Sequence, residues 1–384
     1  MKKSYLMIAA AAAMFAACSN NDTFKEVDNQ DVAIGFDGKY VNKATRAEIN
    51  EAWFQTSGKH FGVYGYKGES FALFTNEDVS WNGSDWVHTT VRFWDKNATD
   101  YNFYAHAPRA AAHTFTNKKY TFTSIPVITE INTGDPDIVV ATPITAMGYG
   151  NCTHTDVNGH GEGHVEFDFN HILSKLAFKV KTSVPSSAAE ITVTEVKLDF
   201  PTGAATWAQA NADAVAGTTT YSSYTAKDGI GNDGKPILAN FETAVFSGTT
   251  AALTSTGVSL VDATNSSNVG NTFIVTPVAV SPATTGLEHV FGVKVTYNIQ
   301  YKKLNPAYAT DNTVEQYIND GDPETDCIAT GVIGGGNTTA TQYKPAQNSS
   351  YIITIDVNPA QIQFCVDNVI GWDTDITTTE GEVK

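Results

Sequence analysis

The stretch DVAIGFDGKYVNKATRAE, residues 31–48, decides how the rest of the chain is interpreted. Near its start, the apolar residues Val32, Ile34 and Phe36 alternate with small or acidic residues. A period of two is typical of a β-strand that buries one face. We therefore expect a strand over residues 32–40, and a polar segment separates this strand from the arginine that follows it.

That arginine, Arg46, is one of only three in the chain. The other two, Arg92 and Arg109, lie among aromatic and alanine residues, a composition that is typical of folded core. Arg46 alone stands in a small, polar segment just after a strand. We therefore predict that this strand is a temporary part of the fold and that the chain is cut at Arg46.

Length and composition predict two β-rich domains. The chain has 384 residues, which suits two domains once the N-terminus is set aside. Strand-forming residues are abundant, and Gly, Asn, Asp and Pro separate short alternating runs, so we expect an all-β sandwich fold with few short helices. The formal net charge of −17 argues against nucleic acid as a partner, because such binding requires basic patches.

The N-terminus has the features of a targeting segment. Lys2 and Lys3 precede an apolar run, residues 6–17, which is too short to span a bilayer. The run ends in two alanines before Cys18, and polar residues follow. This order is similar to a bacterial lipobox, which implies a signal peptide over residues 1–17 and acylation of the Cys18 thiol. The alternative is an ordinary secretory signal with an incidental cysteine.

The middle of the chain contains a change of register. In residues 165–180 the apolar positions switch from odd to even numbers between Asn170 and Lys175, which predicts a bulge or turn there. The segment 181–190 that follows is rich in Ser, Pro and Ala. We interpret it as the boundary between the two domains.

Two segments of the second half differ in character. Residues 202–235 are rich in Gly, Ala and Thr and are interpreted as a long loop with a short helix near residues 207–215. At the C-terminus, Ile362, Phe364 and Val366 alternate with other residues, and apolar residues continue to Trp372 after a register change. This alternation predicts a last strand.

No motif predicts an enzyme or a cofactor site. A G-x-G-x-x-G match at residues 229–234 lacks the preceding strand and following helix of a dinucleotide site, so we interpret it as a turn. The metal-ligand candidates are His154, His160 and His164, but the glycines around them favour a loop in which the imidazoles do not converge. We expect no metal, no cofactor and no catalytic residue, and we interpret His171 as a structural histidine.

The chain resembles the fimbrillin family of Bacteroidales, whose members are lipoprotein-derived pilins. The resemblance lies in the order and spacing of several segments rather than in one specific motif. These segments are FGVYGY (61–66), FWDKNATDYNFYAHAP (93–108), PDIVVAT (136–142), FNHILSKLAFKV (169–180), YIITIDV (351–357) and IQFCVDNVIGW (362–372).

The resemblance implies a fold and a maturation route. The fold is two tandem transthyretin-like, Greek-key β-sandwich domains, here residues 47–182 and residues 183–384. The route is export as a lipoprotein to the outer membrane, followed by removal of residues 18–46 when an Arg-specific protease cuts between Arg46 and Ala47. The strand containing Val32, Ile34 and Phe36 would leave with the lipid.

The resemblance also implies that a strand from another copy of the chain fills the vacated groove. The donor would be residues 360–376, and its apolar side chains would be Ile362, Phe364, Val366, Ile370 and Trp372. A missing core strand leaves unpaired backbone groups and apolar surface, which suits strand addition. Such a head-to-tail contact does not close, so it builds filaments. From the residues alone, this segment is equally an ordinary last strand of its own domain.

These observations predict a stalk subunit of an extracellular fimbria that supports adhesion and biofilm formation. Arg46 and a C-terminal donor strand are both present, and a stalk subunit needs both. Its partners would be copies of itself or related subunits, the outer membrane before maturation, and the protease. The alternative is a monomeric surface lipoprotein, or a tip or anchor subunit, that binds host glycans or proteins.

Overall fold

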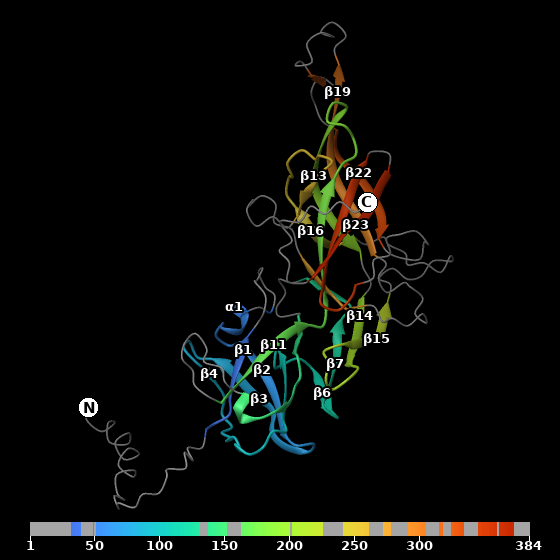
Figure 1. The fold of residues 1–384 in the computed structure, drawn as a ribbon. Coiled ribbons are helices and arrows are strands. Elements are labelled where there is room, and N and C mark those ends of the chain that lie inside the picture. The colour runs from blue at the N-terminus through green and yellow to red at the C-terminus, as the bar shows by residue number, and fades with distance from the viewer. Residues whose placement is uncertain are drawn as a thin grey trace, which may run out of the picture. The chain divides into compact units, whose positions relative to one another are not determined.

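The computed structural model is composed almost entirely of β-strands, as predicted (Figure 1). Its helical elements in the described part of the chain are α1 (Glu51–Phe54) and the 3-10 helix η2 (Tyr149–Asn151). Within the same part, no helix is long and apolar enough to cross a membrane. The structure describes residues 32–39, 49, 51–130, 137–151, 163–199, 202–225, 241–260, 272–277, 291–304, 315–317, 324–333, 345–358 and 361–371.

An eight-stranded sheet contains the strand that opens the described chain. Its order is β1-β11-β9-β5-β2-β3-β4, and β10 pairs with β5. Strand β1 is parallel to β11, whereas the other pairs in this sheet are antiparallel. The strands are β1 (Gly35–Lys39), β2 (His60–Lys67), β3 (Phe71–Trp81), β4 (Trp86–Val87), β5 (Tyr101–Ala107), β9 (Val139–Ala141), β10 (Ile144–Met147) and β11 (His164–His171).

A four-stranded sheet, in the order β15-β14-β7-β6, corrects one expectation. Its strands are β6 (His113–Thr116), β7 (Lys119–Pro126), β14 (Thr202–Gln209) and β15 (Gly217–Thr225). The predicted long loop with a helix near residues 207–215 is therefore wrong where the chain is described. Ala205, Trp207 and Gln209 are buried in alternation. The period of two is present in the sequence, but Trp207 is its only large apolar residue, and such a pattern resembles a loop.

A six-stranded and a five-stranded sheet pack around one core. The first has the order β23-β22-β12-β18-β8 with β17 beside β12, and the second has the order β16-β13-β19-β20 with β21 beside β19. Side chains from both sheets, such as Phe178, Ile353, Val193 and Val295, lie in one buried cluster, which is the arrangement of a β-sandwich.

The bounds of these strands are as follows. The six-stranded sheet comprises β8 (Ile128–Glu130), β12 (Ser174–Lys181), β17 (Val258–Ser259), β18 (Phe273–Val275), β22 (Ser349–Asn358) and β23 (Gln361–Gly371). The five-stranded sheet comprises β13 (Ala189–Asp199), β16 (Thr243–Ser247), β19 (Phe291–Leu304), β20 (Glu315–Tyr317) and β21 (Glu324–Ile333).

The predicted turn between Asn170 and Lys175 is confirmed, and it marks a change of sheet. Strand β11 ends at His171 in the eight-stranded sheet, and β12 begins at Ser174 in the six-stranded sheet. Ile172 and Leu173 between them are fully buried. Sheet membership thus changes before the boundary expected at residues 181–190, and the division into two domains stays a prediction.

Candidate functional site

Strand β1 is the terminal strand of its sheet path, and the two residues that precede it bond to a second segment. On one side it pairs with β11 in the register Gly35 to His164 and Phe36 to Val165. On the other side the Ile34 N–H donates to the Arg92 carbonyl at 2.8 Å. Ala33 also forms an isolated bridge with Phe93. Removing β1 would therefore leave unpaired backbone groups on two neighbouring segments.

The apolar side chains of β1 and of the residue just before it lie in an aromatic core. Ile34 and Phe36 are each 1% exposed. The Phe36 ring contacts four rings, with centroids 4.9 Å from Phe74, 5.0 Å from His88, 5.9 Å from Phe103 and 6.0 Å from Phe167. Burying side chains of this size stabilises a fold by about 1.5–3 kcal/mol each. Val32, the first residue of the predicted strand, is half-buried and lies outside β1.

Two histidines make polar contacts with β1. His164 Nδ1 lies 3.0 Å from Asp37 Oδ1, and His88 Nε2 donates to the Ile34 carbonyl at 3.1 Å. The imidazole of His164 also covers Gly35: a Cβ at that position would lie 2.5 Å from His164 Nε2. We call Phe74, His88, Phe103, His164 and Phe167 the β1 groove. The imidazole of His164 can lie over the strand only because residue 35 is a glycine.

The buried carboxylate of Glu77 holds the segment of residues 88–93, which lies beside β1 on the side away from β11. Glu77 accepts hydrogen bonds from the backbone N–H groups of Thr89 and Thr90 at 3.0 and 2.7 Å, and from both hydroxyls. Burial alone would raise the pKa of Glu77, but the hydrogen bonds from Thr90 and Thr89 outweigh it and hold that pKa below its ordinary value. The ionised carboxylate thus organises residues 88–93 beside β1.

Arg92 and Arg109 were both expected to lie in the folded core, but the structure buries only one of them in part. Arg109 is half-buried and donates to the Asn76 carbonyl through Nε and one terminal nitrogen. Arg92, however, is exposed, and so are its neighbours Val91 and Phe93. The interpretation of Arg92 as folded core is therefore wrong. Neighbouring aromatic residues misled it, because this segment meets β1 through its backbone and turns these side chains outward.

Several predicted site residues fall outside the described part of the chain. These residues are Cys18, Arg46, Ala47, His154, His160 and Trp372. His164 is described, and its imidazole contacts β1. No group of three or more metal-ligating residues occurs within the described ranges. His171 Nδ1 lies 2.7 Å from Asp137 Oδ2 and both side chains are buried, which agrees with the interpretation of His171 as a structural residue.

The proposed donor is seen at the backbone level as β23. It lies antiparallel to β22, with Phe364 opposite Ile355 and Ile370 opposite Ser350, and the register shifts between Ile352 and Ile353. Ile362 and Val366 also belong to this strand. Strand β23 is the terminal member of its sheet path. In this state it is a last strand of its own sheet, so donation would require it to leave β22.

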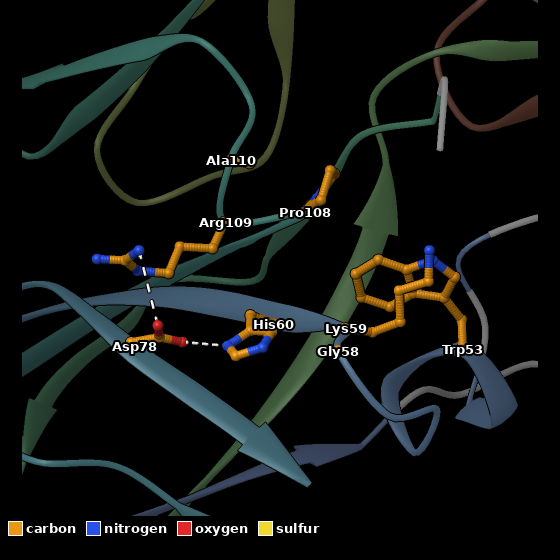
Figure 2. Close-up of a pocket in the computed structure, with 8 residues that line it drawn as sticks. All are labelled: Trp53, Gly58, Lys59, His60, Asp78, Pro108, Arg109 and Ala110. Atoms are coloured by element: carbon orange, nitrogen blue, oxygen red, sulfur yellow. Dashed lines mark hydrogen bonds and ion pairs between the residues drawn. The ribbon is translucent and has the colours of Figure 1, made fainter. Parts of the chain in front are cut away.

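A pocket of about 310 Å³ lies near the start of β2. Figure 2 shows Lys59 beside the Trp53 ring, and His60 and Arg109 directed at Asp78. A paired His and Asp occur in hydrolase triads, but no Ser, Cys or Thr lines this pocket to act as a nucleophile. Trp53 is 7% exposed, so its indole offers no open face for a glycan.

Solved structures similar to this chain include proteins of Bacteroides and Porphyromonas species. A fimbrial protein of Bacteroides vulgatus is 17% identical over 88% of this chain and 99% of its own, with a TM-score of 0.47. A proposed cell adhesion protein of Bacteroides uniformis is 16% identical over 89% and 99%, with a TM-score of 0.43. The tip fimbrial protein Mfa3 of Porphyromonas gingivalis, solved with a C-terminal truncation, is 11% identical over 84% and 96%, with a TM-score of 0.32. Scores this low support no conclusion about function.

Family membership rests on a different comparison. No curated protein matches the chain. The model of the family described as fimbrillin-like matches residues 45–320, which is most of the chain. The match contains α1 and every strand from β2 to β20. The chain therefore belongs to the fimbrillin-like family.

Proposed function

We propose that this chain is a stalk subunit of a cell-surface fimbria and that it polymerises after its N-terminal strand is removed at Arg46. Membership of the fimbrillin-like family supports a fimbrial role and a structural rather than an enzymatic protein. The single observation that carries the strand-exchange step is the burial of β1. Ile34 and Phe36 are each 1% exposed, β1 pairs with β11, and Ile34 just before it bonds to Arg92 on the other side.

The energetics favour exchange over an empty groove. Loss of β1 exposes the aromatic walls around Phe36 and the backbone groups that had bonded to Gly35 and Ile34. Each large apolar side chain returned to such a site contributes about 1.5–3 kcal/mol before the cost of ordering the strand. An incoming strand from another copy therefore has a strong driving force, and a chain that still holds β1 has none.

N-terminal sequencing of the surface form tests the cut. Chains beginning at Ala47 support maturation at Arg46, and recovery only of chains beginning at Cys18 contradicts it. Arg46→Lys should abolish the ladder of oligomers that appears on unheated denaturing gels after treatment with an Arg-specific protease. Arg92→Lys is the matched control, because Arg92 is an exposed arginine whose carbonyl bonds to Ile34, just before β1. If only Arg92→Lys lost the ladder, cleavage at Arg92 rather than at Arg46 would be indicated.

We also propose that Cys18 is acylated, which holds the precursor at the outer membrane until the cut. Incorporation of labelled palmitate into the wild type and not into Cys18→Ser would support this step. A labelled Cys18→Ser protein would contradict it. The extracellular fimbria then supports adhesion and biofilm formation.

The second candidate is a monomeric surface protein that binds glycans or host proteins. Size-exclusion chromatography after protease treatment separates the two functions. A protein that loses residues 18–46 and remains monomeric would favour binding. Deletion of residues 360–384 should stop polymer growth while the monomer stays folded, and a deletion variant that still forms ladders would exclude this donor.

A further inference from the structure

The sequence of β1 recurs near the C-terminus. Residues 34–37 read Ile-Gly-Phe-Asp, and residues 370–373 read Ile-Gly-Trp-Asp. The pattern Ile-Gly-aromatic-Asp occurs at these two places only. A third Ile-Gly-x-Asp, at residues 230–233, has Asn232 in the aromatic position. The first copy lies in the β1 groove, and the second begins within the last residues of β23.

Each shared position meets a specific feature of the groove. Gly35 lies under the His164 imidazole, where a Cβ would come within 2.7 Å of three ring atoms. Asp37 receives the hydrogen bond from the same ring, which holds the imidazole over the glycine. His164 therefore favours a strand in which glycine stands two positions before an acceptor. Residues 371 and 373 meet both requirements.

The other two shared positions supply the buried face. In the alignment of the two tetrapeptides Ile370 corresponds to Ile34 and Trp372 to Phe36, whose ring packs between aromatic walls. An indole is larger than a phenyl ring, so the groove would have to widen, and His88, whose side chain is 13% exposed, is the least buried of the four rings around Phe36. The match ends at the next position, because Thr374 replaces Gly38, which lies against half-buried Trp86.

We propose that the β1 groove of one subunit binds Ile370–Asp373 of a second copy in the register of Ile34–Asp37 and parallel to β11, with His164 selecting the glycine and the acid. This inference rests on the proposed strand exchange and gives it a register. It places Ile370 and Trp372 in the groove. Ile362, Phe364 and Val366, which precede them, fall outside the positions occupied by β1.

Cross-linking tests the register in the full chain. Lys39 is opposite Asp168 in the β1–β11 pair, so residue 375 of the donor should lie opposite Asp168 of its neighbour. Asp375→Cys with Asp168→Cys, in a chain whose downstream native cysteines are serine, should form a covalent ladder with a short thiol cross-linker after protease treatment. Asp375→Cys with Glu166→Cys is the control, shifted by two residues on the same strand, and should cross-link at least about tenfold less.

The outcomes separate this register from the exchange itself. A ladder on unheated gels with cross-linking at Glu166, or at neither position, overturns the register while strand exchange stands. Absence of any ladder in the wild type overturns both. Preferential cross-linking at Asp168 supports the proposed register.

A compensating pair of substitutions tests the role of His164. Gly371→Val should slow ladder formation by about tenfold or more, because its side chain would meet the His164 ring. Adding His164→Ala in the same chain should restore assembly, since the ring is then absent. The control is Thr374→Val, three residues after Gly371. It leaves the side-chain volume almost unchanged and should assemble like the wild type. Normal assembly of Gly371→Val, or failure of His164→Ala to restore it, would overturn the selection by His164. Thermal melts of each monomer exclude a folding defect as the cause.

Discussion

His164 Nδ1 and Asp37 Oδ1 lie 3.0 Å apart and join the first residue of β11 to a strand 127 positions earlier in the chain. Truncation of the ring in His164→Ala would leave the Asp37 carboxylate, which is 8% exposed, without this donor. Losing a hydrogen bond to a charged, buried group costs about 1.5–3 kcal/mol. Hydrogen exchange of the β1 amides should therefore report a lower opening free energy by that amount.

The control for this substitution is His60→Ala. His60 also pairs with an aspartate, Asp78, but both side chains are about two-fifths exposed. Exposed pairs contribute about 0–1 kcal/mol, so β1 exchange should remain close to the wild type in this variant. Equal effects of the two substitutions would contradict a specific role of His164 in holding β1.

Phe36→Ala should weaken β1 more than any polar substitution. The ring is 1% exposed and surrounded by aromatic side chains, so truncation leaves a cavity as well as losing apolar burial. Such changes cost about 3–5 kcal/mol. Urea unfolding and β1 exchange should both register the loss. Ala33→Ser, at an exposed position just before β1, should change stability by less than about 0.5 kcal/mol.

Acid should loosen the segment that flanks β1. The pKa of Glu77 is lower in the folded chain than its ordinary value, because hydrogen bonds from Thr90 and Thr89 outweigh the effect of burial. The stability that it contributes is complete above its ordinary pKa, about 4.5, and is lost as the pH falls through the lower folded value. The opening free energy that hydrogen exchange reports for the amides in residues 88–93, after correction for the intrinsic rate at each pH, should therefore fall in this acidic range.

The matched variant for the pH experiment is Glu77→Gln, which keeps a hydrogen-bond acceptor without the titrating charge. It should be less stable than the wild type at about pH 7 and should lose less stability between about pH 7 and about pH 3. Parallel pH profiles of the two proteins would assign the acid response to other carboxylates.

A buried histidine and a buried aspartate lie in contact at the end of β11, where the chain turns into β12. His171 and Asp137 are each 1% exposed and lie 2.7 Å apart. Leaving a buried polar group without its partner costs about 1–3 kcal/mol. His171→Ala should lower the free energy of unfolding by this amount in urea titrations. A loss below about 1 kcal/mol would mean that the pair contributes no more than an exposed one.

Local pattern was sufficient to predict several elements. Alternation of Ile34 and Phe36 identified the opening strand, and both side chains are buried. The change of parity near Asn170 identified the turn between β11 and β12, because a strand cannot switch faces without one. That β1 is removed, and that β23 is donated, stay predictions.

Other features depend on contacts that no local pattern contains. The parallel pairing of β1 with β11 joins residues far apart in sequence, so the position of His164 over Gly35 followed only from the register. Strand β14 alternates small and polar residues around Trp207, and burial arises because β7 and β15 flank it. The nearest sequence signal for the groove was the glycine and aspartate on either side of Phe36.

The distance along the chain between β1 and β11 also bears on the order of folding. Pairing Gly35 with His164 closes a very long loop, whereas β2, β3 and β5 pair with strands much nearer in sequence. Long-range contacts pay a larger entropic cost and form late. We expect the other strands of the sheet to assemble first and β1 to dock last. If the other strands of the sheet fold before β1 docks, we expect them also to remain folded after β1 is removed.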